Sequence, residues 1–281
     1  MSEDSSLINL GNLSKPAAVL VEKVCNAVGV IYEPTRIRRK AIAEADASKI
    51  TAIAALELRE IEQRAVERLI RQETRKQENI ESITAQAISV LPLSAEVDKL
   101  DEDWTAHFFK QCETVSDKQM QSLWSRLLLG EATKPGTFSK RSVDFVSSID
   151  HRDASLFTTF CQFIWTLGEP CPLIYDVQDD IYKKQGITFI ALKHLDAIGL
   201  ISFESVSGYQ RQCVGKYAQT SYYDQPMRIE FSTDTANSID IGHVLLTSTG
   251  RELASICGAV RNPDFFSYVT TRWRTNGLVL T

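Results

Sequence analysis

The chain has 281 residues, of which 43% are hydrophobic and 24% are charged, with a formal net charge of −5 and a pI near 5.5. This is the composition of an ordinary soluble protein with one large domain or two ordinary ones. The acidic balance argues against a protein coated in nucleic acid, although it leaves room for a local basic patch, and the lack of an uncharged apolar run of 18 residues argues against a membrane-spanning helix.

The first predicted region covers residues 1–91. Residues 17–32 follow Pro16 and carry apolar side chains on one broad face, so they predict a short amphipathic helix that Glu33 and Pro34 interrupt. Thr35–Val90 contains no glycine or proline and is rich in strong helix formers. It therefore predicts a long helix, of about 80 Å if continuous.

The apolar stripe along this long helix is narrow, and it fades over residues 72–79, which are all polar. A helix with so little apolar surface cannot form a core by itself. It either pairs with another helix in a coiled-coil-like contact, within the chain or in a homo-oligomer, or lies as a solvated helix on the rest of the protein. We expect a homo-oligomer through this helix. The stripe consists of Ala54, Leu58, Ile61, Ala65 and Leu69.

The second predicted region, residues 92–168, has the apolar spacing of a compact helical bundle. One of its helices is expected to begin at Ser116, an N-cap in capping-box register with Gln119. Val115 and Met120 stand at the positions of a hydrophobic staple around this cap. Gly130 is expected to supply the left-handed residue that ends the helix.

The end of this region carries turn and capping signals of its own. Pro135-Gly136 predicts a turn, and Ser139 predicts an N-cap for the next helix. Asp150 is expected to cap a fourth helix over residues 154–167, which Gly168 ends.

The third predicted region, residues 169–281, shifts towards short runs of β-branched and aromatic residues. A helix over residues 187–198 precedes a strand over 200–205. A long polar stretch then leads to strands near 228–232 and 239–247, and a helix over 251–260 follows. This order resembles a winged helix. The predicted fold class is therefore mainly α, with a long N-terminal helix, a central helical bundle and a C-terminal α+β winged-helix-like domain.

A family resemblance rests on the central segment and on the block Tyr32–Ala41. The chain resembles a bacterial family known as a domain of unknown function and grouped with the Abi-alpha abortive-infection proteins, over residues 15–165. The resemblance implies a role in phage defence or exclusion. The residues that carry it are Asp103-Trp104, Val115-Ser116-Asp117, Met120-Gln121, Leu123-Trp124, Leu127-Leu128, Gly130-Glu131, Pro135-Gly136 and Phe138-Ser139-Lys140-Arg141.

Three residues of this segment are not explained by capping or turn geometry, and they are candidate interaction residues: Glu131, Lys140 and Arg141. They could form a ligand or phosphate site at the helix N-terminus that Ser139 caps. The favoured alternative is that Ser139 caps the helix and the two basic side chains form a solvated surface. Trp124 is expected in the core rather than in a ligand platform.

A basic cluster near the N-terminus is a candidate for contact with a membrane or a partner. Its side chains could dock on an anionic membrane surface, with about 1 kcal/mol from each. The alternative is a contact within the chain or an oligomer, supported by the nearby Glu44 and Asp46. The cluster is Arg36, Arg38, Arg39 and Lys40.

Candidate nucleic-acid contacts lie in the winged-helix-like region. However, residues 151–281 carry 11 basic and 13 acidic side chains, and Asp179, Asp180 and Asp196 stand close to the lysines. A DNA reader normally needs a positive face, so a protein-binding winged helix is favoured. The candidates are Lys183, Lys184, Lys193 and Arg211.

No catalytic motif of the GxGxxG, GxxxxGK[ST], GxSxG or HExxH type is present. The six cysteines are scattered without a CxxC pair and there are only four histidines, so no metal and no cofactor are expected. Cysteines in apolar contexts suggest free thiols and a cytoplasmic location, with a peripheral position at the inner membrane if the basic cluster docks there. Because residues 1–6 are acidic and polar, no signal peptide is expected.

Two functions follow from the sequence. The leading one is a non-enzymatic interaction protein, a phage-defence component that acts through self-association or membrane contact, with a further protein partner allowed. The alternative is a nucleic-acid-binding regulator that uses the C-terminal domain.

Overall fold

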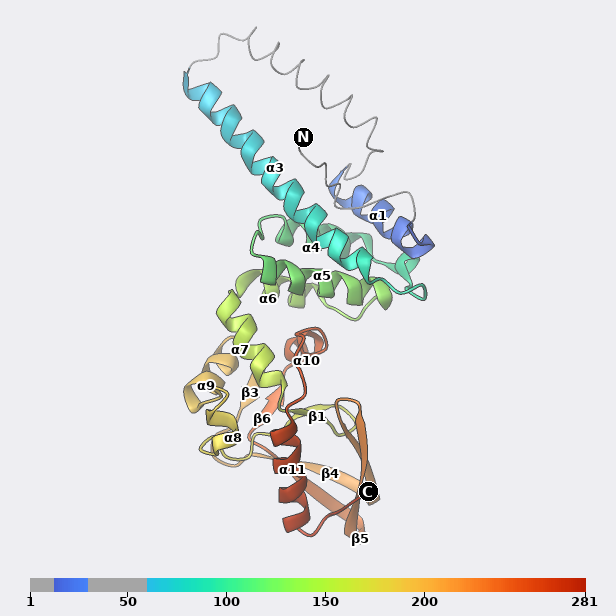
Figure 1. Ribbon diagram of the computed structural model, residues 1–281, viewed down its shortest axis with the longest axis vertical. Helices are drawn as coiled ribbons and strands as arrows, with labels where there is room; N and C mark the ends of the chain where they lie inside the picture. The colour runs from blue at the N-terminus through green and yellow to red at the C-terminus, as the bar shows by residue number, and fades with distance from the viewer. Residues whose placement is uncertain (1–12, 30–59) are drawn as a thin grey trace. The chain divides into compact units, whose positions relative to one another are not determined.

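The computed structural model describes residues 13–29 and 60–281 (Figure 1). The chain divides into two compact units, Met1–Ser148 and Ile149–Thr281. The described residues are mainly helical, as predicted, and their β-strands all belong to the second unit.

The first unit is a bundle in which α3 packs on α5, α1 on α4, and α4 on α6. Its centre is aromatic, because the Phe108 ring lies edge-on to Trp124 with centroids 5.2 Å apart. Trp124 is completely buried, which confirms its predicted place in the core. The elements are α1 (Lys15–Val28), α3 (Glu60–Ser89), the short 3-10 helix η2 (Val97–Lys99), α4 (Glu102–Cys112), α5 (Lys118–Thr133) and α6 (Lys140–Ser148).

Polar side chains fix α3 against the start of α5. The Gln121 amide is almost fully buried, and its Nε2 donates to Asn79 Oδ1 at 3.0 Å and to the Val115 carbonyl at 2.9 Å. Asn79 Nδ2 donates in turn to the Glu113 carbonyl at 2.9 Å and to Ser116 Oγ at 3.2 Å. Buried amides with satisfied partners set one register for the two helices, because any shift would leave polar groups unpaired.

The N-cap of α5 is Asp117, and the prediction of Ser116 with its capping box and staple is wrong. Asp117 Oδ1 accepts from the backbone N–H of Gln119 at 3.0 Å and of Met120 at 2.9 Å. Ser116 is instead engaged by Asn79. A tertiary hydrogen bond to the serine leaves the aspartate to cap the helix.

Gly130 does not end α5, which continues to Thr133, so this prediction is also wrong. The glycine is needed for packing, because a Cβ at this position would lie 2.5 Å from Cε2 of the Phe138 ring. The positive φ of 83° belongs to Gly136, in the turn predicted there. Ser139 Oγ accepts from the backbone N–H of Ser142 at 3.3 Å, as expected of a cap for α6.

The second unit begins with α7 (His151–Cys161), whose N-cap is Asp150 as predicted. Hydrogen bonds from the backbone N–H groups of Asp153 and Arg152 lower the pKa of the Asp150 carboxyl below its ordinary value. The predicted continuation of this helix to residue 167 is wrong. Residues 164–166, near the end of the predicted helix, instead form β1 (Ile164–Thr166). This strand pairs with β2 (Pro170–Pro172) across a turn in which Gly168 has a φ of 78°.

An antiparallel five-stranded sheet dominates the second unit, with the order β2-β1-β4-β5-β7. Its centre is a long hairpin of β4 (Tyr209–Tyr222) and β5 (Gln225–Gly242), and β7 (Val279–Leu280) pairs with β5. The predicted strand near 228–232 lies within β5, the predicted strand over 239–247 is divided between the end of β5 and β6, and the polar stretch before them contains β4. A separate antiparallel pair joins β3 (Ile201–Phe203) to β6 (Val244–Leu246).

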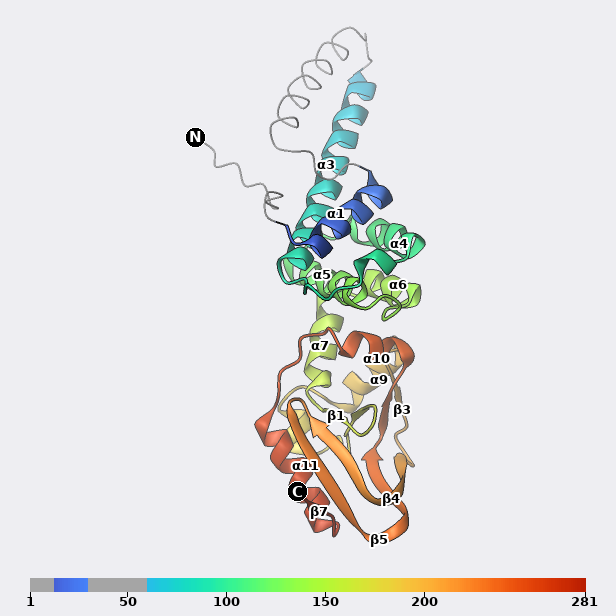
Figure 2. The same cartoon turned by 90° about the vertical axis from the view of Figure 1, so that its right-hand side faces the viewer.

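Helix α11 (Pro263–Thr275), which the sequence did not predict, packs on the five-stranded sheet (Figure 2). Trp165 of β1 stacks on Tyr222 of β4 at 5.0 Å and meets Trp273 of α11 edge-on at 4.8 Å. These three large rings are buried and form the core of the unit. The other helices are α8 (Asp180–Lys183), α9 (Phe189–Ala197) and α10 (Ser248–Ala254).

Candidate interaction surfaces

Glu131 is a structural carboxylate rather than an exposed interaction residue, because only 2% of it is exposed. Its Oε1 accepts from the backbone N–H of Gly136 at 2.6 Å, and its Oε2 accepts from that of Phe138 at 2.8 Å. Trp104 Nε1 holds the same loop by donating to the Phe138 carbonyl at 2.8 Å. Glu131 therefore clamps the turn between α5 and α6.

Lys140 and Arg141 are exposed at the first turn of α6. Lys140 lines an open hollow of about 450 Å³ that also includes Glu131. Arg141 does not line this hollow. Glu96, Lys99 and Asp101 line it as well, and Lys99 is paired with Glu96 at 3.0 Å, so the hollow has no excess of basic side chains. This arrangement agrees with the solvated surface favoured from sequence and gives no positive site for a phosphate.

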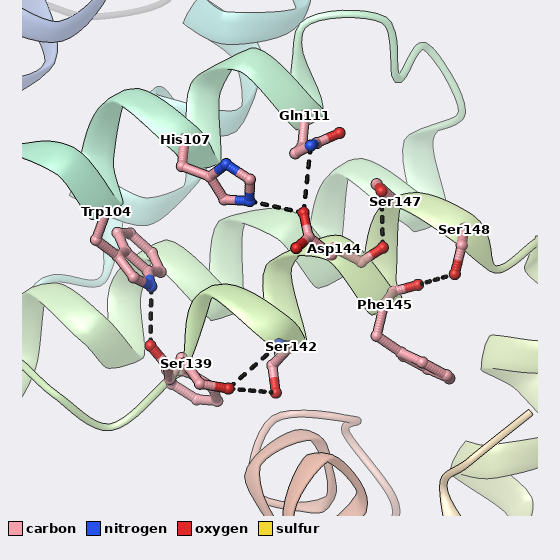
Figure 3. A network of polar contacts seen from close by, with 10 residues as sticks. Trp104, His107, Gln111, Ser139, Ser142, Asp144, Phe145, Ser147 and Ser148 are labelled. Atoms are coloured by element: carbon pink, nitrogen blue, oxygen red, sulfur yellow. Dashed lines mark hydrogen bonds and ion pairs between the residues drawn. The ribbon is translucent and has the colours of Figure 1, made fainter.

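A histidine–aspartate pair that the sequence did not reveal joins α4 to α6 (Figure 3). His107 Nε2 lies 2.6 Å from Asp144 Oδ1, and Gln111 Nε2 donates to the same oxygen at 3.3 Å. A second pair, His194 and Asp153, has the same 2.6 Å separation in the second unit. The partners are 37 and 41 residues apart in sequence, so no local motif marks them.

These pairs are surface links between helices. The Asp144 side chain is 56% exposed, and the His194 side chain is 46% exposed. A catalytic dyad usually depends on a desolvated environment that shifts its protonation. In residues 13–29 and 60–281, no group of three or more His, Cys, Asp or Glu side chains is placed to hold a metal ion.

The nucleic-acid candidates of the second unit are largely paired with carboxylates. Lys184 lies 3.7 Å from Asp180, and Lys193 lies 3.5 Å from Asp196. Arg211 Nη1 donates to Glu169 at 2.9 Å. Within the described residues, Lys183 is the member of the candidate set without an ion pair. The structure does not bring the four side chains together into one positive face.

Arg272 and Trp273 of α11, a basic and an aromatic residue side by side, are also engaged within the fold. Trp273 is buried and donates from Nε1 to Tyr175 Oη at 3.0 Å. The Arg272 guanidinium lies over the Tyr175 ring, 4.2 Å from its centroid, and 3.4 Å from Asp240. Arg272 thus packs on the sheet core instead of standing free for a ligand. The earlier basic cluster, Arg36, Arg38, Arg39 and Lys40, lies outside the described residues.

The N-terminal half of α3 is exposed and carries a regular pattern of side chains. Over residues 60–76, here called the exposed half of α3, only Val66 and Lys76 are even partly covered. Figure 1 shows this half reaching beyond α4 and α5. Ile61 is 66% exposed and Leu69 is 56% exposed. The predicted apolar stripe is therefore present on a helix here, and in its described part it faces solvent.

Comparison with known proteins places the chain in a family. It belongs to a family of proteins of unknown function, DUF2806, which matches residues 63–270. The match includes most of α3 and nearly all of the second unit. The prediction of a family of unknown function is thereby confirmed at this level. No curated protein and no solved structure matches the chain.

In the described part of the chain, no helix is both long enough and apolar enough to cross a bilayer. α3 has the length but alternates acidic and basic residues along its exposed half.

Proposed function

We propose that the protein is a non-enzymatic interaction protein that self-associates through the exposed half of α3. The exposure of Ile61 and Leu69 on one face of this helix carries the proposal. Fully burying a side chain of this size stabilises a complex by about 1.5–3 kcal/mol. A helix with this narrow stripe gains stability from a partner helix rather than from a globular core.

A second copy of the chain fits the stripe because the stripe is symmetric about Ala65. A twofold axis beside Ala65 places Ile61 of each antiparallel copy opposite Leu69 of the other, four residues to either side. The small Ala65 side chains allow the helices to approach closely where they cross. Such a contact is isologous, as in most homodimers.

The test is the mass of the full-length protein by sedimentation at about 1–100 µM. We expect a dimer that Leu69→Glu converts to a monomer, because the change buries a charge at the contact. Ile70→Glu is the matched control, since Ile70 is also exposed but lies on another face of α3. A monomeric wild type, or equal dissociation by both variants, would refute the proposal. Circular dichroism checks that each variant remains folded.

A role in phage defence follows from the family resemblance and is proposed on that ground alone. If self-association is needed for it, cells that express the wild-type chain should reduce phage plating, and cells that express Leu69→Glu at equal level should not. A membrane contact through Arg36, Arg38, Arg39 and Lys40 would appear as flotation with anionic vesicles. The six cysteines, all free thiols, support a cytoplasmic setting.

The second unit supports a winged-helix-like module that contacts protein. Helix α9 precedes β3, which pairs directly with β6. In the sequence the long β4–β5 hairpin comes between these two strands, where a winged helix would carry its wing. Phe189 and Ile190 are exposed at the first turn of α9, whereas the nearby lysines are mostly paired with aspartates. A surface with exposed apolar side chains and paired charges is better suited to bind another protein than the phosphate backbone of DNA.

A further inference from the structure

Four arginines form a single stripe on the exposed half of α3. Arg64, Arg68, Arg71 and Arg75 follow one another at spacings of four, three and four residues. At 100° per residue they fall within about 60° around the helix axis, and at 1.5 Å per residue they extend over about 16 Å. They line an open hollow of about 440 Å³, together with Glu67 and Gln72.

Most of this positive charge is not neutralised within the described residues. Arg64 lies 3.5 Å from Glu60, but no ion pair involves Arg68, Arg71 or Arg75 in that part of the chain. All four are exposed. The stripe therefore differs from the four lysines of the second unit, three of which have a carboxylate partner within 4 Å.

The chemistry of the stripe is suited to phosphodiesters. A guanidinium group presents planar donors that match phosphate oxygens in a bidentate way, and it remains charged at every physiological pH. A row of such groups along a straight helix faces a row of evenly spaced phosphates more naturally than a single anion. From these observations we infer that the arginine stripe of α3 binds the phosphate backbone of nucleic acid.

A membrane surface fits the same helix less well. An amphipathic membrane helix buries its apolar face in the bilayer interface, and its polar face carries basic residues that contact the anionic headgroups on both sides of the apolar face. On α3 the arginine stripe lies on one flank of the Ile61–Leu69 stripe, with the two centres about 90° apart around the axis and Arg68 about 20° from Ile61. The other flank carries Glu62 and Glu73, and Glu73 lies 3.0 Å from Lys76, so this flank supplies no basic row to match the arginines on the opposite side of the apolar stripe. Arg64, Arg71 and Arg75 lie about 40–80° from Ile61, outside the face that a second copy would cover.

The experiment measures binding of the full-length protein to a fluorescent 25-base-pair DNA duplex by anisotropy, at 50 mM and 200 mM salt. The test variant is Arg68→Gln/Arg71→Gln/Arg75→Gln. Its matched control, Lys183→Gln/Lys184→Gln/Lys193→Gln, removes an equal number of positive charges from the second unit. Arg68→Lys/Arg71→Lys/Arg75→Lys keeps the charge but not the guanidinium geometry.

We expect the arginine variant to bind on the order of 100-fold more weakly near 100 mM salt, with a salt slope reduced by about 2 to 3 because three phosphate contacts are lost. The lysine control should bind as the wild type does, and the Arg→Lys variant should retain much of the binding. Absence of wild-type binding at 50 mM salt would overturn the inference. Equal loss in the lysine control would also overturn it, as would binding to anionic vesicles but not to DNA. The stripe lies within one chain, so the result does not depend on whether α3 self-associates.

Discussion

In the C-terminal half of α3, Ile80, Ile83 and Ala87 are buried beneath the neighbouring helices, whereas in the exposed half Ile61 and Leu69 lie in water. The exposed half is rich in the strong helix formers Glu, Arg and Gln, whereas the buried half also carries Ile, Ser and Thr, so propensity favours the helix more strongly in the exposed half. Tertiary contact differs in the opposite sense, since neighbouring helices cover only the C-terminal part of α3. The same apolar residue types therefore stabilise the fold at one end and are available for a partner at the other.

The polar residues of the two halves differ in the same way. Asn79 and its neighbour Gln121 are buried and exchange hydrogen bonds that fix the helix register. Arg68 and Arg71 point into solvent and have no ion-pair partner within the described residues. A polar group that is buried and satisfied belongs to the architecture. A charged group that is left exposed and unpaired in a regular row is a candidate for recognition.

The largest expected effect comes from shortening a buried side chain. Ile83→Ala should lower the free energy of unfolding by about 2–5 kcal/mol, because it removes apolar contacts and leaves a cavity. Ile70→Ala, the same change in the exposed half, should alter it by less than about 0.5 kcal/mol. Urea unfolding followed by circular dichroism measures both. Similar losses in the two variants would show that the halves are not distinct environments.

The buried polar network should give the next largest effect. Asn79→Ala removes one of the two acceptors of Gln121 Nε2 and the donor to the Glu113 carbonyl, so it should cost about 1–3 kcal/mol. Gln72→Ala, on the exposed half, removes an amide that faces solvent and should be nearly neutral. The same unfolding experiment decides the point, and a neutral Asn79→Ala would mean that the network does not set the register of α3 on α5.

The start of α5, on which the buried half of α3 rests, gives a smaller effect. Asp117→Ala should lower stability by about 1 kcal/mol, since two backbone N–H groups lose their acceptor. Gln119→Ala should have little effect because its side chain is exposed and takes no part in the cap. Thermal unfolding compares the two. A larger loss of stability for Gln119→Ala than for Asp117→Ala would mean that Ser116 and Gln119 form a capping box after all.

The helices of the first unit could be predicted from periodicity, but their ends could not. Ser116 and Asp117 are adjacent and both are good caps. The choice is made by Asn79, 37 residues away from Ser116, and no local pattern contains it. Gly130 likewise has the local signature of a helix stop, while its real constraint is the Phe138 ring that packs against it.

The second unit was harder to predict because its sheet is formed by distant pairing. β4 is rich in polar residues because much of it faces solvent, and its strand character depends on β5 rather than on its own sequence. Among the candidate sites, the sequence marks Glu131 as a residue that capping does not explain. Its role as acceptor for the backbone N–H groups of Gly136 and Phe138 is visible only in the geometry of the turn. The arginine stripe, by contrast, is visible in sequence spacing. Only the structure shows that it is exposed.

The smallest effect concerns how strongly the exposed half is coupled to the rest of the fold. Gln63→Gly places a poor helix former in the exposed half, at a local cost of about 0.5 kcal/mol. If this half opens independently, the global free energy of unfolding should not change, and amide hydrogen exchange over residues 60–76 should become about twofold faster. Gln86→Gly is the matched control in the buried half, and its cost should appear in global unfolding instead. A global loss for Gln63→Gly would mean that the exposed half unfolds together with the bundle, and the contrast between the halves would then be one of surface exposure but not of stability.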